Sequence, residues 1–530
     1  MAVIALPNIE PQGSVVTDEW ELRSLSARQQ SPMVGTFTTL ERPGSHWAVT
    51  PKFHNLSTAY RARMQQFLAS CRGYANRFYV PLYGWTRRGS FPATELFTNT
   101  AFTSTTGWTP TNATVTAQDG ALRLMVTTPA ANVSLQQAVS LTQYAPHVHR
   151  SLLIDGPQTP GLSIGRFLGD GTVATNDYGT SRGLGTAVLV PVSASSTAQF
   201  PAFISSTTGF TAGAYLTIAY ASLSRCALVD NGPNALLRSD EFDNASWTKT
   251  NCTAGSNTLT APDGTATGDT LVEDSTTSAH TFSQAVTVSA TTSLEYSFSV
   301  ALRQNIRSWA AIELVEGTGA TTAAAFVNLG AGTLGTVSAS GNWANARAFV
   351  RSLGNSWYQV TIVARKTNAA TAVTARIYSA TADTAASYLG DGSAAIGVWR
   401  ATLAQSSVPT RLRQTTTAAN TGTAQTGGGL FLKGLPASTN GLLLPGDPAE
   451  VITGTSTQLV RTRASLDSDA SGLGCFEFEA PIRVSPSDNA AVIIQNPLCR
   501  MMLDSPNVEW SEHSGGFSDV EFTAVEDTYP

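Results

Sequence analysis

The sequence is poor in charge and has no concentrated block of basic residues. Lysine, arginine, aspartate and glutamate together make up 13% of the 530 residues, about half the share found in an average soluble domain. The formal net charge is −5 and the pI is about 5.7. Because no basic stripe or patch can be traced along the chain, we do not expect a nucleic acid as partner.

The cysteines are few and have no recognisable spacing. The chain has five of them, an odd number, with no C-x-x-C pair, which argues against a disulfide framework and a zinc site. We expect neither a metal nor another cofactor. The N-terminus lacks the basic start and apolar run of a signal peptide. No stretch approaches the roughly 20 apolar residues of a membrane span, so we expect synthesis in a cytoplasm, no membrane insertion, and any later exposure outside a cell by assembly.

Apolar residues, by contrast, are present in normal amounts, at 42%. The place of the missing charges is taken by Ser, Thr, Ala and Gly, and the shortage of Glu and Lys combined with frequent Thr and Val favours short strands and turns. Length alone suggests about three domains. A weakly charged, hydroxyl-rich surface suits neutral sugars or protein neighbours.

The first 92 residues predict strands and a single helix. Strands are expected at 34–40 and 47–53, with a Pro-Gly turn between them, and a further buried strand at 76–83. Between them, apolar residues at a spacing near 3.6 predict a helix over 56–71. The residues on its apolar face are Leu56, Tyr60, Met64, Phe67, Leu68 and Cys71.

The middle of the chain has a different composition and is internally repeated. Short alternating runs with turn residues between them predict β-sandwiches, and similar openings near Phe102 and Phe242 divide them into 93–233 and 234–413. Residues 414–429 form a linker by composition. From 430 to 530 the style of residues 1–92 returns. The simplest interpretation is one discontinuous core domain, 1–92 with 430–530, carrying two inserted modules.

Motifs that would indicate catalysis do not fit their surroundings. G-x-S-x-G occurs at 161–165 and at 179–183, without the strand before and the helix after that a nucleophile elbow needs. Glu477 and Glu479 lie about 7 Å apart on one face of a predicted strand, near the spacing of an inverting glycosidase. Since Phe478 between them points to the core, a solvated or subunit-facing strand is the preferred interpretation. We therefore expect no enzyme activity.

Metal motifs are equally incomplete. His147 and His149 alternate on one strand without a third ligand nearby. Residues 467–472 resemble the start of a calcium loop but lack its distal glutamate, so a hairpin turn is expected there.

Aromatic residues in the second module are the candidates for binding a sugar. A sugar ring has a flat face of C–H groups that an aromatic ring can cover, while polar neighbours bind the hydroxyls. Trp343 lies in loop-like sequence and is the best exposed candidate; Trp309 and Tyr388 are the others. Trp357 and Trp399 lie on apolar strands, where core packing is favoured.

Several distinctive motifs lie at the two ends of the chain. The motifs near the start are Gln30-Ser31-Pro32, Arg42-Pro43-Gly44-Ser45-His46-Trp47 and Arg77-Phe78-Tyr79-Val80. Those near the end are Lys433-Gly434-Leu435-Pro436, Gly441-Leu442-Leu443-Leu444-Pro445-Gly446-Asp447, Phe476-Glu477-Phe478-Glu479-Ala480-Pro481-Ile482-Arg483 and Asn507-Val508-Glu509-Trp510. In this order they resemble one family, the distal tail proteins of long-tailed bacteriophages (siphophages).

The middle resembles the carbohydrate-binding-like jelly rolls that are inserted in phage tail proteins. The residues that carry this likeness are Asp240-Glu241-Phe242-Asp243-Asn244-Ala245-Ser246-Trp247-Thr248-Lys249-Thr250, Ala261-Pro262-Asp263-Gly264-Thr265-Ala266-Thr267, Asn355-Ser356-Trp357-Tyr358, Gly390-Asp391-Gly392 and Pro409-Thr410. The first module departs from the pattern because it lacks both the Trp-Tyr pair and the Ala-Pro-Asp-Gly turn.

Together the resemblances imply a mainly β chain with a discontinuous β-sandwich or barrel core, one helix and two inserted jelly rolls. They further imply a tail-tip hub in the virion. In that family the hub is a homo-oligomeric, six-membered ring that contacts tail-tube and tail-tip proteins and displays modules able to adhere to host-surface glycans. Two alternatives stay open: a tail-associated glycan-degrading enzyme, and a hub whose inserts are purely structural.

Overall fold

The fold was analysed in a computed structural model of the chain. The structure describes residues 3–6, 16–23, 27–30, 37–40, 45–82, 87–92, 94–118, 120–128, 133–155, 162–167, 173–177, 183–190, 197–205, 212–316, 321–423, 425, 427–453, 456–505, 509–513 and 518–527. These residues form β-strands almost throughout, with one helix, α1 (Thr58–Cys71), which confirms the predicted mainly β fold. No helix in the described ranges is long and apolar enough to cross a membrane.

Both ends of the chain enter one eight-stranded sheet, here called the scaffold sheet. Strand β6 pairs with β37, and β5 pairs with both β39 and β40, so residues more than 400 positions apart are neighbours. The strands in order are β1 (Val3–Ala5), β6 (Arg77–Pro81), β37 (Leu498–Leu503), β40 (Ala524–Glu526), β5 (His46–Leu56), β39 (Ser518–Glu521) and β38 (Glu509–Glu512), with β2 (Val16–Arg23) also paired to β5.

Helix α1 packs on the scaffold sheet through the apolar face that the sequence predicts. Tyr60, Met64 and Phe67 are buried against Phe78 and Phe522 of the sheet region. Ser57 is the N-cap residue, and Arg72 ends the helix in the left-handed conformation, a common way to stop a helix.

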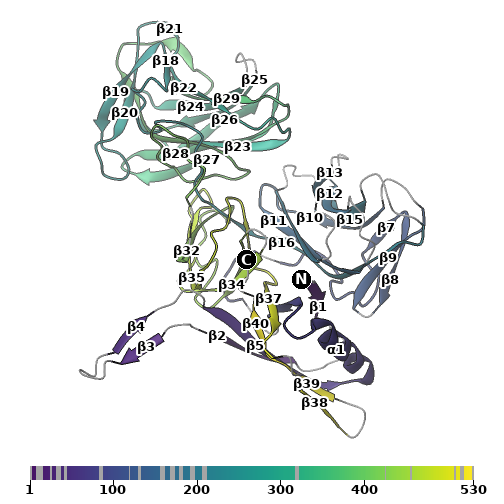
Figure 1. The fold of residues 1–530 in the computed structure, drawn as a ribbon. Helices are drawn as coiled ribbons and strands as arrows, with labels where there is room; N and C mark the ends of the chain where they lie inside the picture. Colours follow the sequence, from purple (N-terminus) through teal and green to yellow (C-terminus); the bar gives the residue numbers. More distant parts are fainter. Residues whose placement is uncertain are drawn as a thin grey trace.

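A closed six-stranded barrel lies next to the scaffold sheet (Figure 1). Its strand β35 alternates, with Phe476 and Phe478 inside while Glu477 and Glu479 face outward. The barrel strands in order are β17 (Ala227–Val229), β32 (Gly427–Lys433), β35 (Gly474–Ile482), β34 (Ser456–Thr462), β33 (Pro448–Thr453) and β36 (Ala491–Ile493).

Strand β17 changes the domain boundaries expected from the sequence. Residues 227–229 were expected inside the first insert, 93–233, yet they pair with β32 and β36 of the barrel. The chain therefore leaves the barrel, builds the first module, returns for one short strand, and leaves again. Three residues carry too little periodicity for the sequence to reveal such a return.

The first module, residues 94–225, is a sandwich of two five-stranded sheets. Its described core includes Phe97, Trp108, Leu124 and Leu216. One sheet has the order β13 (Val173–Asp177), β12 (Leu162–Phe167), β15 (Thr197–Ser205), β10 (Ser134–Ser140) and β7 (Thr109–Thr111); the other has β14 (Gly183–Leu189), β11 (His147–Asp155), β16 (Tyr215–Arg225), β9 (Ala121–Val126) and β8 (Ala113–Gln118).

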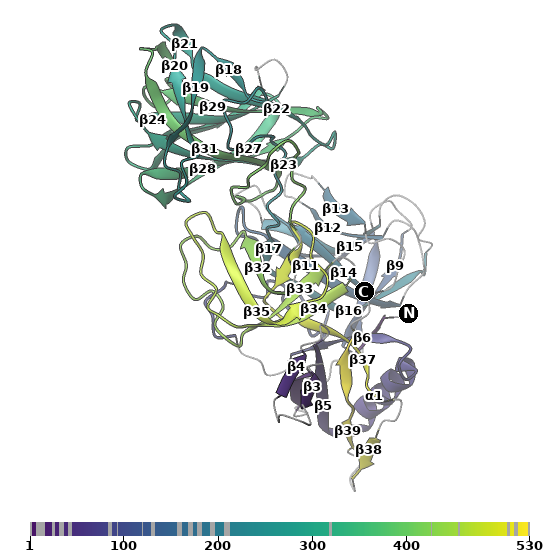
Figure 2. The ribbon, with the colours of Figure 1, turned by 60° about the vertical axis from the view of Figure 1, so that its left-hand side comes forward.

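The second module, residues 234–405, is a sandwich of two six-stranded sheets. Sheet one has the order β18 (Thr248–Thr250), β22 (Thr281–Thr287), β29 (Ala372–Ala380), β24 (Trp309–Glu316), β25 (Thr321–Asn328) and β26 (Thr333–Ala339). Sheet two has β19 (Cys252–Leu259), β20 (Gly268–Glu273), β31 (Ala394–Gln405), β23 (Leu294–Gln304), β28 (Trp357–Lys366) and β27 (Trp343–Gly354), and β21 (Thr277–Ala279) pairs separately with β30 (Ser387–Leu389). The second module lies on the side of the barrel away from the scaffold sheet, and the first module lies beside the barrel, where β11 and β14 also contact β1 of the scaffold sheet (Figures 1 and 2).

The segment expected as a linker, 414–429, is held in place over much of its length. Thr415 donates to the carbonyl of Leu236 at 2.7 Å, and Asn420 forms a bridge with Asn234. Its last residues, from Gly427 onward, belong to β32. Hydroxyl and amide side chains of this segment hydrogen-bond to the backbone of the residues that lead from β17 into the second module. The composition of the segment alone does not indicate these contacts.

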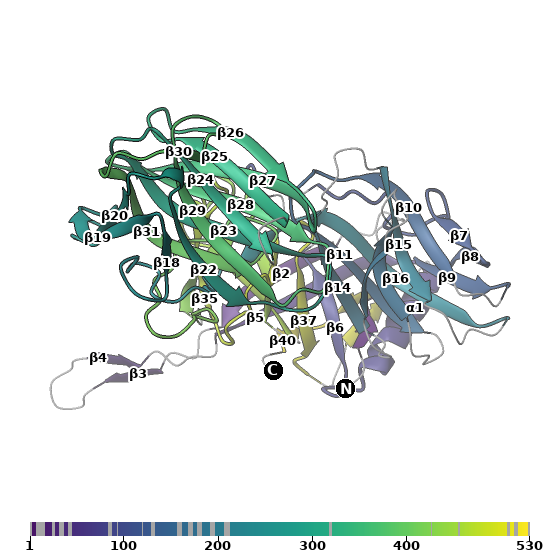
Figure 3. The ribbon, with the colours of Figure 1, turned by 90° about the horizontal axis from the view of Figure 1, so that it is seen from above.

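One hairpin stands apart from these units. Strands β3 (Ala27–Gln30) and β4 (Phe37–Leu40) pair with each other and join no larger sheet of the described chain. Figure 3 shows the hairpin extended away from the body of the molecule.

Candidate ligand-binding face of the second module

The structure removes Trp343 from the candidates for an exposed sugar platform. Its side chain is only 3% exposed and belongs to the core of the second module. Trp343 is the first residue of strand β27 rather than part of a loop, and the turn before it is closed by a hydrogen bond from its own N–H to the carbonyl of Ser340. The Gly-Asn turn thus directs the ring inward, and the sequence-based expectation of exposure is wrong.

Tyr388 is occupied within a polar cluster at one end of the second module. Its hydroxyl donates to Ser379 Oγ at 2.7 Å and also contacts the buried carboxylate of Glu273. Arg307 lies over the ring at 4.9 Å, and the His280 ring is 4.9 Å away on centroids. Burial, followed by the contact with Glu273, raises the pKa of Tyr388. These contacts close the end of the sandwich and leave little of the ring for a ligand.

Trp309, the third candidate, lies on the outer face of sheet one. In β24, Ala310, Ile312 and Leu314 belong to the module core. Because side chains alternate along a strand, Trp309, Ala311 and Glu313 point to the opposite face. Trp309 is partly buried there.

Next to Trp309, two further aromatic residues flank a small one. Ala311 pairs with Tyr378 of β29 on one side and with Phe326 of β25 on the other. Neighbouring strands are about 4.8 Å apart, so these two aromatic side chains start about 10 Å apart across the face. Both are partly exposed, whereas Ala311 is buried at 1%. Tyr378, Ala311 and Phe326, with Trp309, are called the aromatic row below.

A charged network stands beside the aromatic row. Arg376 Nη1 donates to Glu313 Oε2 at 3.1 Å and to the Tyr378 hydroxyl at 2.7 Å, and that hydroxyl also donates to Glu313. Burial, with a further contribution from the Glu313 carboxylate, raises the pKa of Tyr378. The phenol therefore stays protonated, and each group is held in position by the other two, which favours a preorganised set of donors and acceptors.

The arrangement combines the two elements that a neutral sugar needs. Partly exposed rings can cover the C–H face, and fixed charged groups can bind hydroxyls at its edge. Tyr378 and Phe326 were missed in the sequence. Burial alternates along residues 372–380, where Val373, Ala375 and Ile377 are core residues. This alternation could have assigned Tyr378 to the outer face.

The remaining sequence motifs have structural roles. Glu477 pairs with Arg463 on the outer face of the barrel, and Asp469 accepts backbone N–H groups of Ser471 and Leu473 within a turn. His149 is fully buried, and burial lowers its pKa to about 3. Ser163 of the first G-x-S-x-G lies within strand β12, and residues 179–182 of the second lie outside the described residues.

The charged side chains do not gather into a metal site in the part of the chain described. No group of three or more His, Cys, Asp or Glu residues there could hold an ion.

Comparison with known proteins adds no assignment. No protein family and no curated protein matches the sequence. Among solved structures, the tandem CBM22-1–CBM22-2 domain of Xyn10C from Paenibacillus barcinonensis is similar at 12% identity and a TM-score of 0.21, over 60% of this chain and 99% of that one. The arabinofuranosyltransferase AftD from Mycobacteria is similar at 10% identity and a TM-score of 0.16, over 80% of this chain and 37% of that one. At these TM-scores neither likeness carries an argument about function.

Proposed function

We propose that the chain is a structural hub of a bacteriophage tail tip whose inserted modules bind host-surface glycans. The observation that carries the proposal is the architecture. Both ends of the chain build one scaffold sheet, and two sandwiches are inserted into the adjoining barrel and project from it (Figures 1 and 2). This organisation suits a component that assembles through its scaffold and displays its modules outward.

The scaffold also has features suited to assembly into a ring. Strand β38 is at one end of the scaffold sheet, and an edge strand has free backbone groups that a second copy can pair with. The β3–β4 hairpin extends from the body (Figure 3), and a two-stranded hairpin alone is marginally stable in water. We propose that copies of the chain join through these elements in a closed ring, six-membered as the tail-protein resemblance implies, between tail-tube and tail-tip proteins of the virion.

Electron microscopy and mass measurement of the full-length protein and of intact tails test the hub. The expected result is a cyclic oligomer at the junction of tube and tip. A monomer within assembled tails would overturn the ring, and its absence from purified tails would overturn the tail assignment altogether.

For the second module we propose that the aromatic row binds a neutral glycan. One stacked aromatic residue contributes on the order of 1 kcal/mol, so a single site is weak, about millimolar. Several copies in a ring would raise avidity by about 10²–10⁴.

Phe326→Ala tests this because Phe326 is partly exposed and can be removed with little loss of core packing. Attachment of tails that carry the variant to host cells should fall strongly. Ile306→Ala is the matched control, since Ile306 is 48% exposed in a turn of the same module. If both variants attach like the parent tails, the aromatic row does not bind the host surface.

The enzyme alternative has its own readout. Incubation of the purified protein with host polysaccharide should release no reducing ends. A steady release that follows the protein through purification would contradict the proposal and favour a glycan-degrading enzyme.

A further inference from the structure

A cleft of about 480 Å³ separates the second module from the barrel. It opens on sheet two of the module, the sheet opposite the aromatic row. Its lining has three arginines, Arg351, Arg400 and Arg411, two aspartates, Asp263 and Asp469, and apolar surface that includes Leu353 and Phe431. Its volume is within the range of small-molecule sites, roughly 300–1,000 Å³.

Two of these arginines lie over aromatic rings. The Arg411 guanidinium is 3.6 Å from the centre of the Phe431 ring, and Arg400 is 4.0 Å from the centre of the Trp399 ring. Stacking uses the faces of a guanidinium and leaves its N–H groups available at the edges. Phe431 is 40% exposed, so one of the two stacked pairs is open to solvent.

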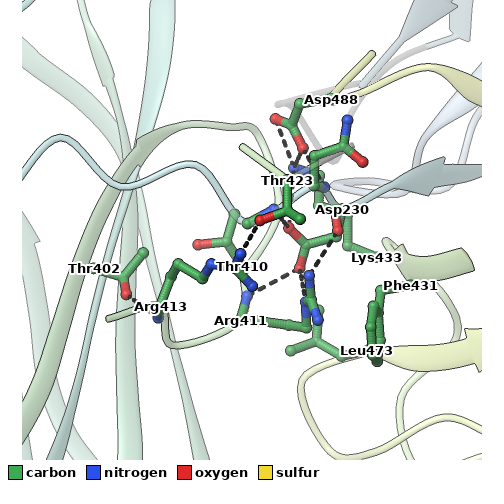
Figure 4. Close-up of polar contacts among 12 residues, drawn as sticks. Asp230, Thr402, Thr410, Arg411, Arg413, Thr423, Phe431, Lys433, Leu473 and Asp488 are labelled. Carbon is green, nitrogen blue, oxygen red and sulfur yellow. Dashed lines mark hydrogen bonds and ion pairs between the residues drawn. The ribbon is translucent and has the colours of Figure 1, made fainter. Parts of the chain in front are cut away.

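Arg411 is fixed from behind by the buried Asp230 (Figure 4). Its Nη2 donates to the Asp230 carbonyl at 3.1 Å, and its Nε lies 3.4 Å from Asp230 Oδ2. Asp230 also faces Lys433 at 4.0 Å, and Lys433 binds Asp488. The carboxylate of Asp230 is therefore shared between two cations and cannot satisfy Arg411 completely.

The cleft consequently has more hydrogen-bond donors than acceptors. Within the described chain, Nη1 of Arg411 and Nη1 of Arg400 donate to no acceptor, and Nε of Arg351 is buried without one. The lining aspartates are already engaged, Asp469 with Arg351 and Asp263 with Arg400. Burial lowers the pKa of Arg411 although Asp230 opposes this, and a bound anion would favour the charged form further.

We infer that this cleft is a second ligand site, which takes a saccharide unit carrying an acidic group. The free Nη1 groups of Arg411 and Arg400 can donate charge-assisted hydrogen bonds to a carboxylate or a phosphate. The exposed Phe431 ring and Leu353 provide apolar surface for the C–H face of the sugar. The site is independent of the aromatic row, because its residues belong to sheet two, the connecting segment and the barrel.

Titration calorimetry on the full-length protein tests the inference. The probes are the galacturonic acid dimer against the neutral galactose dimer, and glucose 6-phosphate against glucose. Saturable binding of an acidic member, weakened by salt and absent for its neutral partner, is expected; which acidic probe binds identifies carboxylate or phosphate as the natural group. No binding of either acidic probe, equal binding of the neutral partners, or equal binding of inorganic phosphate alone would overturn it.

Variants locate the site. Arg411→Gln should weaken binding about tenfold or more, as expected for loss of one charge-assisted contact. Phe431→Ala should weaken it up to about tenfold through loss of the ring, and it keeps the test decisive if Arg411→Gln fails to fold, because Phe431 is 40% exposed. Arg123→Gln is the matched control: Arg123 also stacks on a tyrosine, at 4.2 Å from the Tyr215 ring, but in the first module. Binding that survives Phe431→Ala unchanged, or that Arg123→Gln weakens equally, would place the ligand elsewhere.

Discussion

The two inserted modules are both sandwiches, but they are attached to the barrel in different ways. In the first, strand β16 ends at Arg225 and barrel strand β17 begins at Ala227, so a single residue separates module from barrel. In the second, 18 residues lie between β17 and β18 and 21 between β31 and β32. Some of these connecting residues pack in the module, yet both connections are longer than the single residue between β16 and β17; on its entry side the first module follows the 27 residues between β6 and β7.

The side chains that contact the barrel also differ between the two modules, and those of the first module are buried. Arg150 of the first module and Glu450 of the barrel form an ion pair at 2.6 Å in which both side chains are at most 1% exposed. Beside it an apolar cluster runs from Val148 through Leu228 to Ile493. The first module is thereby part of one continuous interior with the barrel.

Polar groups of the second module contact its neighbours, some partly exposed and some buried. Arg351 pairs with Asp469 of the barrel, both about one quarter exposed, and Arg347 lies 4.5 Å from the ring of Tyr144 in the first module. Contacts of this kind are weak and are screened by salt. From this comparison we expect the first module to stiffen the scaffold and the second to be freer to change its orientation.

The largest expected effect comes from breaking the buried ion pair of the first module. Glu450→Ala leaves the Arg150 guanidinium buried without its carboxylate and also removes the acceptor of the Leu498 N–H. Loss of one partner of such a pair costs about 3–5 kcal/mol. Denaturant unfolding should show this loss, and limited proteolysis should show release of the first module.

A double variant separates charge from packing. Arg150→Met with Glu450→Leu replaces both charges by apolar groups, which is often close to neutral for buried pairs. Recovery of most of the lost stability is expected. If the single variant Glu450→Ala unfolds like the parent protein, the continuous interior does not hold the first module.

A substitution inside the second module should be nearly as costly but should leave the barrel intact. Trp343→Ala removes a large core side chain, and such changes cost about 3–5 kcal/mol. Calorimetry should show one transition lowered and the others unchanged. Trp309→Ala, on the partly buried outer face, should cost clearly less; equal costs would contradict the different placement of the two rings.

These two tryptophans illustrate how far the sequence alone could be interpreted. Period 3.6 in residues 56–71 was sufficient for α1, because a face of one helix is a local pattern. For Trp343 the Gly-Asn context predicted a loop, but whether a ring at a turn points inward depends on the strand that follows and on the sheet opposite. The short barrel strand β17 was missed for a related reason: its partners lie about 200 residues or more away along the chain.

The candidate sites were predictable to a smaller extent. The aromatic row joins residues of three strands, and only their register brings Tyr378 and Phe326 to either side of Ala311. The cleft depends on how a module meets the barrel. Local composition predicts neither the strand register nor the contact between module and barrel, although single residues of the sites, such as Trp309, could be identified by residue type.

The stability of the first module should depend on pH through Glu95, which lies near the contact with the barrel. Glu95 accepts hydrogen bonds from Leu223 N–H and Ser222, yet burial is the larger influence and raises its pKa. A carboxyl whose folded pKa exceeds the unfolded value, about 4.3, is costlier to ionise in the folded state. Its contribution to stability is therefore full below the unfolded pKa and is lost as the pH rises through the folded pKa.

Glu95→Gln should remove that pH-dependent contribution. Unfolding free energies of parent and variant, measured from about pH 4 to 8, should differ by an amount that changes with pH in the direction just given. Glu241→Gln, in a partly exposed ion pair with Arg238 in the second module, serves as the matched control. A difference between parent and Glu95→Gln that is constant with pH would show that the Glu95 carboxyl does not couple folding to protonation.

The smallest effect on stability, and the sharpest test of the comparison, is expected from Arg351→Ala. Its ion pair with Asp469 is partly exposed, with 24% and 27% of the side chains accessible, so its loss should cost about 0.2–1 kcal/mol.

The same pair spans the cleft between module and barrel, and its removal should broaden the range of module orientations. Small-angle scattering, or energy transfer between dyes on the second module and the barrel, should show a wider distance distribution at nearly unchanged stability. High salt should produce a similar widening in the parent protein because it screens the pair. Distances from the first module to the barrel should not change under either treatment. An unchanged distance distribution for the second module would mean that its connecting segments alone fix its orientation. The two modules would then differ in the side chains that contact the barrel but not in how far they move relative to it.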